Sequence, residues 1–224
     1  MTVEWARRGQ TFPEAVARIP AWLHPVADLA DRLTAEELTR FVPEHGEGRH
    51  SAVLMLFGPD RDLLVIQRAS TMRAHAGQPA LPGGAVDDGE TAIEAALREA
   101  QEETGLDPAG VEVFAQLPDL WLPVTGFVVT PVVGWWSQPS PVWAQDTAEV
   151  ESVHRITIEE FVDPAHRCRV VHPSGYVGPG FEVQGLLVWG FTAGLVSGLL
   201  DLVGWSRPWD ADRLVPLDDP GGQR

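Results

Sequence analysis

The stretch GGAVDDGETAIEAALREAQEETGL, residues 83–106, decides the fold and raises the first question about function. Thr91 and Glu94 have the spacing of a capping box, and Gly105 suits the position just after a helix end. The pattern therefore predicts a helix from Thr91 to Thr104. Apolar residues at helical spacing would form its buried stripe: Ile93, Ala96, Leu97 and Ala100.

The same helix carries an excess of carboxylates. Glu99, Glu102 and Glu103 are three or four residues apart, so we expect them to share one outward face beside Arg98. Like charges at this spacing repel each other, so the face is either a solvated acidic surface or the site of a cation. Mg²⁺ prefers a few carboxylate oxygens and leaves other positions to water and substrate phosphates. The charge pattern by itself leaves both interpretations open.

Composition limits the classes of protein to consider. The chain has 224 residues, of which 44% are hydrophobic, enough for one large domain with a real core. The net charge is −16, and all 16 basic residues are Arg. The lack of Lys excludes lysine-based phosphate loops, Schiff bases and general bases, and the acidic balance disfavours nucleic acid as a partner. The single cysteine, Cys168, excludes an intrachain disulfide and a multi-cysteine zinc site.

Two segments bear on localisation and assembly. Residues 1–16 have no apolar run after their arginines, so we expect no secretory signal, and the lone cysteine fits a reducing cytoplasm. Residues 185–200, GLLVWGFTAGLVSGLL, lack charge, but Asp201 ends the run, and a spanning helix needs about 20 apolar residues. We expect a buried helix or a subunit interface there, with no membrane partner, and a homodimer stays open.

The rest of the pattern predicts several strands and a few helices. Residues 1–47 read as a mostly helical N-terminal extension in which Thr34 and Glu37 form another capping pair. Strands are expected at 50–57 and 62–68, joined as a hairpin by the turn signal GPDR. A loop over 72–84, strands at 111–117, 126–136 and 149–156, a helical turn at 157–161 and two short strands within 169–185 complete the order. This order predicts an α+β fold with a mixed sheet, in a domain over residues 48–205 followed by a tail over 206–224.

The full register of the acidic stretch is more specific than its charge. Gly84 is followed after five residues by Glu90, and after seven more by REAQEETGL, residues 98–106. This register resembles the signature of the Nudix hydrolases at every fixed polar position, with Ala100 where a larger aliphatic residue is usual. The resemblance implies a Nudix fold, a mixed β-sheet sandwiched between α-helices, and hydrolysis of a nucleoside diphosphate linked to another moiety.

The resemblance also implies roles for single residues. Arg98 and Glu90 correspond to an ion pair that orients the ligating carboxylates, and Gly105 corresponds to the helix end. Glu102 corresponds to a catalytic carboxylate that also contributes to metal binding. The positions that match ligands of Mg²⁺ or Mn²⁺ are Glu99, Glu103, Glu102 and, through its carbonyl, Gly84. Such ions neutralise a diphosphate, activate a water and stabilise the leaving oxygen.

A second pattern lies upstream, in RASTMRAHAGQPALPGG, residues 68–84. Arg73, three residues, Gly77, three residues and LPGG resemble the second signature of the coenzyme A pyrophosphatase branch of Nudix enzymes. Leu81 replaces the usual Phe and Pro79 a β-branched residue, and we expect both changes to affect packing more than chemistry. The substrate-binding residues implied by this pattern and by the need for cations near phosphates are Arg68, Arg73, His75, Gly77 and Gln78.

Simpler roles for these and other residues stay open. Arg68 could close a surface hairpin, and Arg73 could pair with one of many acids. Glu149 precedes a late strand, where many Nudix proteins have another catalytic or metal-binding acid, and Glu151 follows two residues on; an ordinary acid at a strand start is the alternative. Surface, packing or interface roles are expected for His154, His166, His172, Trp135, Trp136 and Trp143.

These patterns favour a metal-dependent diphosphatase acting on a small molecule, coenzyme A or acyl-CoA. The products would be adenosine 3′,5′-bisphosphate and (acyl-)4′-phosphopantetheine. Hydrolysis of ADP-ribose or another nucleotide derivative is the first alternative, if Leu81 and Pro79 mark a changed pocket. A nucleotide-binding module without turnover is the second, although such a module has no physical need for three closely spaced carboxylates.

Overall fold

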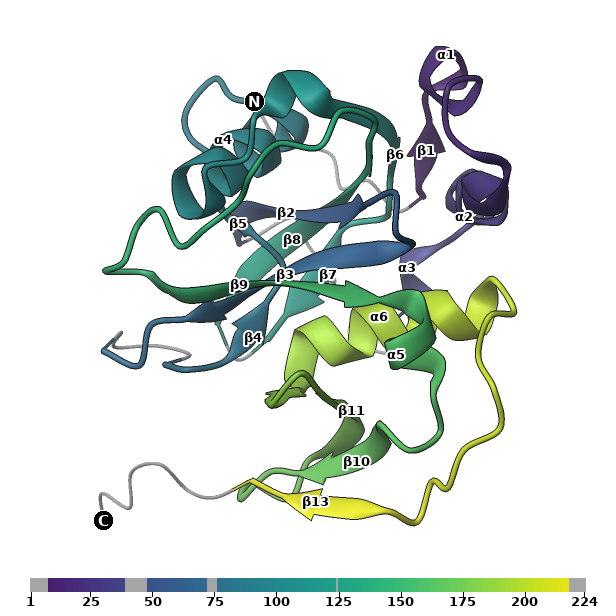
Figure 1. Ribbon diagram of the computed structural model, residues 1–224, viewed down its shortest axis with the longest axis vertical. Coiled ribbons are helices and arrows are strands. Elements are labelled where there is room, and N and C mark those ends of the chain that lie inside the picture. The colour runs from purple at the N-terminus through teal and green to yellow at the C-terminus, as the bar shows by residue number, and fades with distance from the viewer. Residues whose placement is uncertain (1–7, 39–47, 72–75, 124, 218–224) are drawn as a thin grey trace.

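The computed structural model describes residues 8–38, 48–71, 76–123 and 125–217, which form two β-sheets and several helices (Figure 1). The main path of the large sheet runs β1 (Gln10–Thr11), β6 (Val111–Gln116), β8 (Phe127–Trp136), β2 (Arg49–Phe57), β3 (Asp62–Arg68), β4 (Pro79–Ala80). Three more strands pair onto this path: β5 (Gly83–Ala85), β7 (Leu120–Leu122) and β9 (Val150–Thr157). The small sheet has the order β12 (Leu186–Val188), β11 (Val177–Val183), β10 (Arg167–Val171), β13 (Leu214–Pro216).

The large sheet is mixed, as predicted. β2 and β8 pair in parallel over nine register positions, from Arg49 opposite Phe127 to Phe57 opposite Trp135. The other pairings within this sheet are antiparallel among the described residues. The sheet therefore combines local antiparallel neighbours with one long-range parallel pair, which requires a crossover connection between β2 and β8.

The predicted hairpin between residues 50–57 and 62–68 is present but short. β2 and β3 share only the pair Phe57 and Leu63 before they diverge. β3 then pairs along its whole length with β9, and β5 takes the freed edge of β2. Six of the nine residues of β2 are buried, and the strand has β8 on one edge and β5 and β3 on the other. The divergence brings Gly83 and Gly84 between β2 and the acidic helix.

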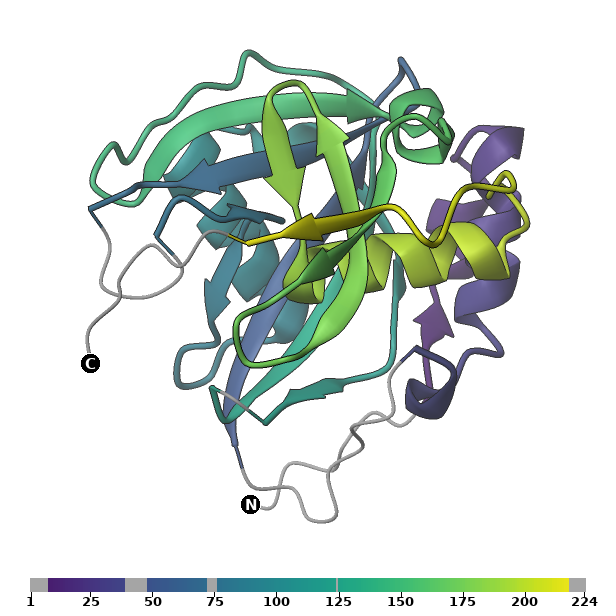
Figure 2. The ribbon, with the colours of Figure 1, turned by 90° about the horizontal axis from the view of Figure 1, so that it is seen from below.

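Helices cover both faces of the large sheet, as predicted for an α/β/α arrangement (Figures 1 and 2). Leu54 and Leu56 of β2 pack in one cluster with α4 (Ala92–Thr104). Met55 and Phe57, which point the other way, pack in a second cluster with α2 (His24–Ala30) and α6 (Gly190–Leu202). Alternate side chains of one strand thus serve two hydrophobic cores.

The apolar C-terminal segment forms a buried helix, one of the two outcomes expected for it. It begins later than residue 185, because residues 186–188 pair as β12 and α6 starts at Gly190. Leu195, Leu199 and even Ser197 are buried against the rest of the chain. The exposed apolar patch on which the homodimer expectation rested is therefore covered within this chain. No helix among the described residues is long and apolar enough to cross a membrane.

The described part of the N-terminal segment is mostly helical and packs on the sheet. It contains β1, α1 (Pro13–Val16), the 3₁₀ turn η1 (Ala21–Leu23), α2 and α3 (Ala35–Leu38). Trp22 of η1 meets Phe57 and Trp135 edge-on, with ring centroids 6.0 and 6.2 Å apart. At the other end, residues 214–216 lie within the predicted tail, yet they add β13 to the small sheet.

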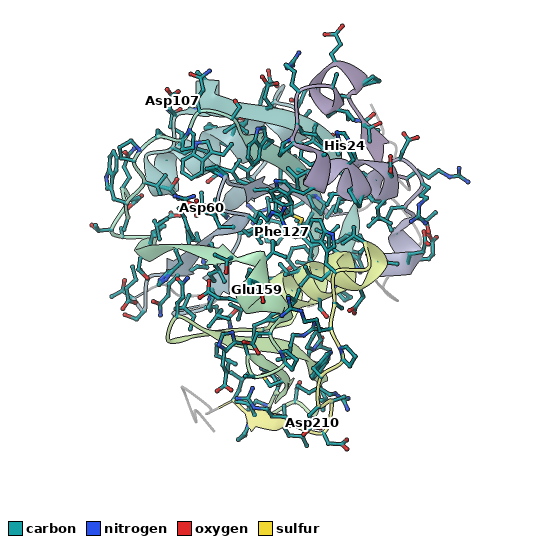
Figure 3. The ribbon with its side chains drawn as sticks, turned by 45° about the vertical axis from the view of Figure 1, so that its right-hand side comes forward. His24, Asp60, Asp107, Phe127, Glu159 and Asp210 are labelled. Carbon is teal, nitrogen blue, oxygen red and sulfur yellow. The ribbon has the colours of Figure 1, made fainter. Side chains whose placement is uncertain are left out.

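Two further short elements complete the chain, η2 (Pro108–Gly110) and α5 (Ile158–Val162). α5 is the helical turn predicted at 157–161, and Thr157 and Glu160 form its capping box. The negative charge is spread widely, since the exposed Asp107 and Asp210 lie at opposite ends of the molecule (Figure 3). A functional carboxylate must therefore be recognised by its burial and neighbours, and not by its charge.

Candidate active site

The register of α4 is fixed at both ends by local interactions. Thr91 accepts the Glu94 backbone N–H at 3.2 Å, and Glu94 accepts the Thr91 N–H at 2.8 Å, which confirms the capping box. Gly105 takes a left-handed φ of 69°, and a Cβ there would lie 2.8 Å from the Trp143 ring. Both constraints require glycine at this helix end. The predicted helix is confirmed, with Thr91 as its N-cap and Ala92–Thr104 as its helical residues.

The buried face of α4 differs from the predicted stripe. Ala96 and Ala100 are buried as expected, but Ile93 and Leu97 are only half-buried. Ala95 is buried in their place, because small side chains let the helix approach the sheet closely.

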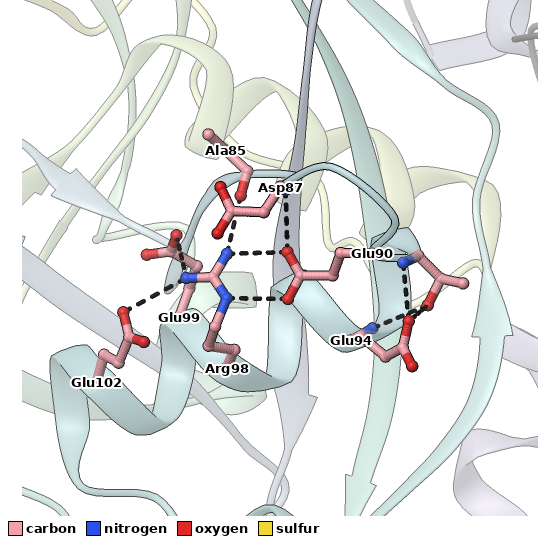
Figure 4. Close-up of polar contacts among 8 residues, drawn as sticks. Ala85, Asp87, Glu90, Glu94, Arg98, Glu99 and Glu102 are labelled. Atoms are coloured by element: carbon pink, nitrogen blue, oxygen red, sulfur yellow. Dashed lines mark hydrogen bonds and ion pairs between the residues drawn. The ribbon is translucent and has the colours of Figure 1, made fainter. Parts of the chain in front are cut away.

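Arg98 is the centre of a polar network at the first turns of α4 (Figure 4). Its Nε and Nη2 donate to the two oxygens of Glu90 at 2.9 and 3.0 Å, and Nη2 also donates to the Ala85 carbonyl at 3.0 Å. Nη1 donates to Glu99 at 2.8 Å and to Glu102 at 3.4 Å. The paired contact lowers the pKa of Glu90, chiefly through the hydrogen bond from Arg98, and raises that of Arg98. The guanidinium therefore ties the loop before α4 to the carboxylates on it.

Glu103 does not face outward with Glu99 and Glu102, so that expectation is wrong. Its residue surface is only 2% exposed, whereas the Glu102 side chain is 59% exposed. Glu103 follows Ala96 by seven residues and Ala100 by three, which places it on the buried stripe of the helix. Burial is the main cause that raises the pKa of Glu103 to about 8.

The neighbours of Glu103 come from two other segments. Its Oε2 accepts the Gly83 backbone N–H at 3.0 Å, and Oε1 lies 3.9 Å from Arg68 Nη1. Both lower the pKa of Glu103 without overcoming the effect of burial, and the charges of Glu99 and Glu149 raise it further. These neighbours therefore hold the carboxyl group in place, but they do not compensate for its burial.

Glu99 lies directly against Gly84. A Cβ on Gly84 would lie 2.4 Å from the Glu99 carboxyl, so any side chain at position 84 would displace this group. Burial raises the pKa of Glu99, the Arg98 hydrogen bond lowers it, and repulsion from Glu102 and Glu149 adds to the rise. Glycine is thus required at position 84, because only a residue without a side chain lets β5 lie this close to the Glu99 carboxyl.

Glu149 joins this group through its charge. It raises the pKa of both Glu99 and Glu103, although it lies outside α4, in the turn that precedes β9. Its backbone is fixed, because its carbonyl accepts the Ala69 N–H at 2.8 Å and its N–H donates to Asp146 at 3.1 Å. Glu151 is exposed on β9 and is not among the main influences on either group. The fold therefore brings a carboxylate 46 positions beyond Glu103 in the chain to the same site.

The carboxyl groups of this site are the type of ligand that hard divalent cations prefer. Across the described residues, no three His, Cys, Asp or Glu side chains already form a set that could hold a metal ion. Burial nevertheless raises the pKa of both Glu99 and Glu103, so a bound cation would favour their ionised forms, and Glu99 lies against a glycine backbone. Hard oxygen donors of this kind suit Mg²⁺ or Mn²⁺. Glu99, Glu103 and the Gly84 carbonyl are the groups that would hold it, with Glu102 and Glu149 at hand.

The residues predicted to bind substrate are only partly described. Arg68 is 21% exposed in its side chain, and its buried Nε has no hydrogen-bond partner among the described residues. Its backbone N–H donates to the Gln78 carbonyl at 3.0 Å, and Gln78 and Gly77, which has a φ of 68°, line a cavity beside β4. Arg73 and His75 lie outside the described residues.

Comparison with known proteins settles the family. Residues 48–171 match the family model of the NUDIX domain. The chain belongs to the Nudix family. It is 41% identical over 166 residues to an uncharacterized Nudix hydrolase, NudL, of Cronobacter sakazakii, covering 70% of this chain and 83% of that one. NudL of Klebsiella pneumoniae (strain 342) is 39% identical over 193 residues, covering 81% of this chain and 97% of its own length.

Solved Nudix structures are more distant. An Ap4A hydrolase from C. elegans has a TM-score of 0.41 and 19% identity, covering 50% of this chain and 83% of that one, too low a score to support an inference. The carboxylate site lies entirely within the residues that match the Nudix domain, since Gly84, Glu99, Glu103 and Glu149 all fall between 48 and 171.

Proposed function

We propose that this Nudix protein is a divalent-metal-dependent diphosphatase that hydrolyses coenzyme A or acyl-CoA. The observation that carries the proposal is the pair of carboxyl groups, the half-buried Glu99 and the buried Glu103, whose pKa values burial raises and which lie against the glycines of β5. A bound Mg²⁺ or Mn²⁺ would neutralise the diphosphate and lower the pKa of an attacking water. Water adds across one P–O–P bond, and the two phosphates leave on adenosine 3′,5′-bisphosphate and on (acyl-)4′-phosphopantetheine.

The protein's own residues orient the groups that react. Arg98 holds Glu99 and Glu102 toward the same side of α4 while Glu90 and the Ala85 carbonyl hold Arg98. Glu102 is the exposed member, so its carboxylate can accept a proton from a water molecule or bind a metal without losing a buried contact. Glu149 is a second candidate for the general base, because its charge acts on both Glu99 and Glu103 although it lies outside α4.

The coenzyme A specificity rests on the pattern in residues 68–84 and on the position of Arg68. Arg68 lies within 3.9 Å of Glu103, so it can reach a phosphate bound beside that carboxylate. Leu81 is 3% exposed and belongs to the hydrophobic core, and Pro79 is buried in β4. These burials support the view that the two departures from the branch pattern alter packing. Arg73 and His75 complete the proposed phosphate contacts.

ADP-ribose or another nucleoside diphosphate derivative is the alternative substrate. It shares the diphosphate and the nucleoside with coenzyme A and differs in lacking the 3′-phosphate and the pantetheine arm. A binding module without turnover is disfavoured, because burying Glu103 with a pKa raised to about 8 destabilises the fold at neutral pH, a cost without benefit in a protein that holds no cation.

A substrate panel tests the proposal. Purified protein with Mn²⁺ or Mg²⁺ would be given coenzyme A, 3′-dephospho-coenzyme A and ADP-ribose, with Glu102→Gln as the matched control. We expect hydrolysis of coenzyme A, slower hydrolysis without the 3′-phosphate, and a large loss of kcat in the variant. Faster hydrolysis of ADP-ribose would overturn the coenzyme A specificity, and no turnover on any substrate would favour the binding module.

The Glu90–Arg98 pair gives a second test. Glu90→Gln removes one charge and leaves Arg98 with a weaker partner, so we expect kcat to fall by about tenfold and stability by about 1–2 kcal/mol. Glu112→Gln is the control: within the described part of the chain Glu112 forms an ion pair with the exposed Arg18, and its replacement should leave both quantities unchanged. Urea denaturation and steady-state kinetics measure the two effects. Unchanged kcat in Glu90→Gln would show that the pair does not position the carboxylates.

A further inference from the structure

A cavity of about 370 Å³ lies at the edge of the large sheet, separate from the carboxylate site. One side is formed by Gln67 of β3 and by Gln78 and Pro79 at β4. The other side comes from residues 172–189 of the small-sheet region, which lies below β4 in Figure 1. Its volume falls within the range of about 300–1,000 Å³ that is typical of small-molecule sites.

One wall of this cavity is a fixed aromatic pair. The rings of His172 and Trp189 stack with centroids 5.6 Å apart and an interplanar angle of 28°. His172 Nδ1 accepts the Ser174 backbone N–H at 3.1 Å and contacts the Ser174 hydroxyl at 2.8 Å, which puts the ring proton on Nε2 and fixes the ring. Trp189 stands between β12 and the first residue of α6, in extended backbone. A flat ligand can stack on this wall without the cost of ordering it.

The other groups in the cavity favour an uncharged planar ligand. Among the described residues that line it, none is Asp, Glu or Arg, so it offers a phosphate no guanidinium partner. Leu186, Leu187 and Leu217 supply apolar surface. Gln67 and Gln78 supply carboxamides, and Gln67 is oriented by the Ser152 hydroxyl, which donates to its Oε1 at 3.1 Å. Aromatic stacking combined with carboxamide groups suits a nucleobase, which has a flat face and polar edges, better than an aliphatic chain.

The cavity lies within reach of the carboxylate site. Gln67 pairs with Pro79 across β3 and β4, and the next residue, Arg68, points to Glu103. From Pro79 to Gly83 the chain can span at most about 14 Å. Gln67 and Arg68 are successive on β3, so their side chains point to opposite faces of the sheet. A nucleotide with its phosphates beside Glu103 would pass around the edge strand β4 to place its base in the cavity.

We propose that this cavity binds the purine base of the substrate nucleotide, stacked on the His172–Trp189 pair with its edge on Gln67 and Gln78. The inference deepens the proposed function and rests on it for the nucleotide. The aromatic wall lies beyond residue 171, where the match to the Nudix domain model ends, so the base site is an addition to the domain core.

Binding can be measured without turnover. The Glu102→Gln protein, labelled with ¹⁵N, would be titrated with adenosine 5′-monophosphate and separately with 4′-phosphopantetheine. The indole N–H signal of Trp189 is assigned by its absence in Trp189→Phe. We expect the adenosine nucleotide to shift this signal and phosphopantetheine to leave it in place. An unshifted signal with the nucleotide, or a shift with phosphopantetheine alone, would overturn the proposal.

Kinetics on the substrate that the wild-type chain hydrolyses provide the second readout. Trp189→Leu should raise KM by about 5- to 100-fold with kcat within about twofold, since stacking contributes roughly 1–3 kcal/mol per base. Trp189→Phe should restore most of the loss, and Trp143→Leu, at an exposed indole away from the cavity, should leave KM unchanged. An unchanged KM in Trp189→Leu would contradict the base site. If no substrate is hydrolysed and the nucleotide still shifts the indole signal, the proposed function fails and the base site stands.

Discussion

The buried carboxylate of Glu103 makes the metal-free protein sensitive to pH. Its pKa is raised from 4.5 to about 8, chiefly by burial, so the folded state holds a proton that the unfolded state has lost. This group contributes fully to stability below about pH 4.5, and the contribution is lost as pH rises toward 8. At about 1.4 kcal/mol per pH unit, the loss reaches about 3 kcal/mol at pH 7 and about 5 kcal/mol above pH 8.

Glu103→Gln removes this ionisation and keeps an oxygen for the Gly83 N–H. In EDTA, we expect the variant to be more stable than the wild type by about 3 kcal/mol at pH 7 and by little at pH 4.5, as measured by urea denaturation across this range. Glu151→Gln, at an exposed position, should show no such dependence.

Added Mn²⁺ should reduce or reverse the difference. A cation that binds only the folded state stabilises it by mass action, and the wild type has the ligand that the variant lacks. Equal stability of the two proteins in EDTA from pH 5 to pH 9 would refute the claim that Glu103 is buried without compensation. A gain in the variant that Mn²⁺ leaves unchanged would refute its role as a metal ligand.

Two further substitutions test the fold around the site. Gly105→Ala should lower the free energy of unfolding by about 2 kcal/mol, because φ is 69° and the Trp143 ring would lie 2.8 Å from the new Cβ. Gly126→Ala, with the same φ and open space around it, should lower it by only about 1 kcal/mol, and thermal denaturation measures both. Arg155→Met should lower the free energy of unfolding by about 2 kcal/mol, because it leaves the 2% exposed Asp62 carboxylate without its ion-pair partner. This figure is discounted for the partial exposure of Arg155, and 1 M NaCl should not abolish the loss. Equal costs for the two glycines, or a salt-sensitive loss at Arg155, would contradict these reasons.

Local signals predicted the elements that depend on near neighbours in the chain. The start and end of α4 follow from Thr91, Glu94 and Gly105, which act within one turn of each helix end. α5 follows from the same capping pattern at Thr157 and Glu160. Such interactions need no tertiary partner, so residue type and spacing are enough to place them.

Pairing and burial could not be predicted in the same way. The turn signal GPDR predicted the hairpin turn, but β5 takes most of that edge of β2 and β4 takes the end of that edge of β3. The sequence predicted that Glu103 is exposed beside Glu99, but in the structure Glu103 is buried and accepts the Gly83 N–H of β5. His172 and Trp189 have no motif spacing, and only the small sheet brings their rings together.

The sequence by itself therefore determined the family register and the acidic helix, because a helix and its caps are specified by residues three or four apart. Only the tertiary structure decided which carboxylates are buried, that Glu149 joins Glu99 and Glu103, and that an aromatic cavity lies beside β4. Those facts depend on contacts between segments far apart in the chain. Such contacts are set by competition among strands for partners and by the close approach that Gly84 allows.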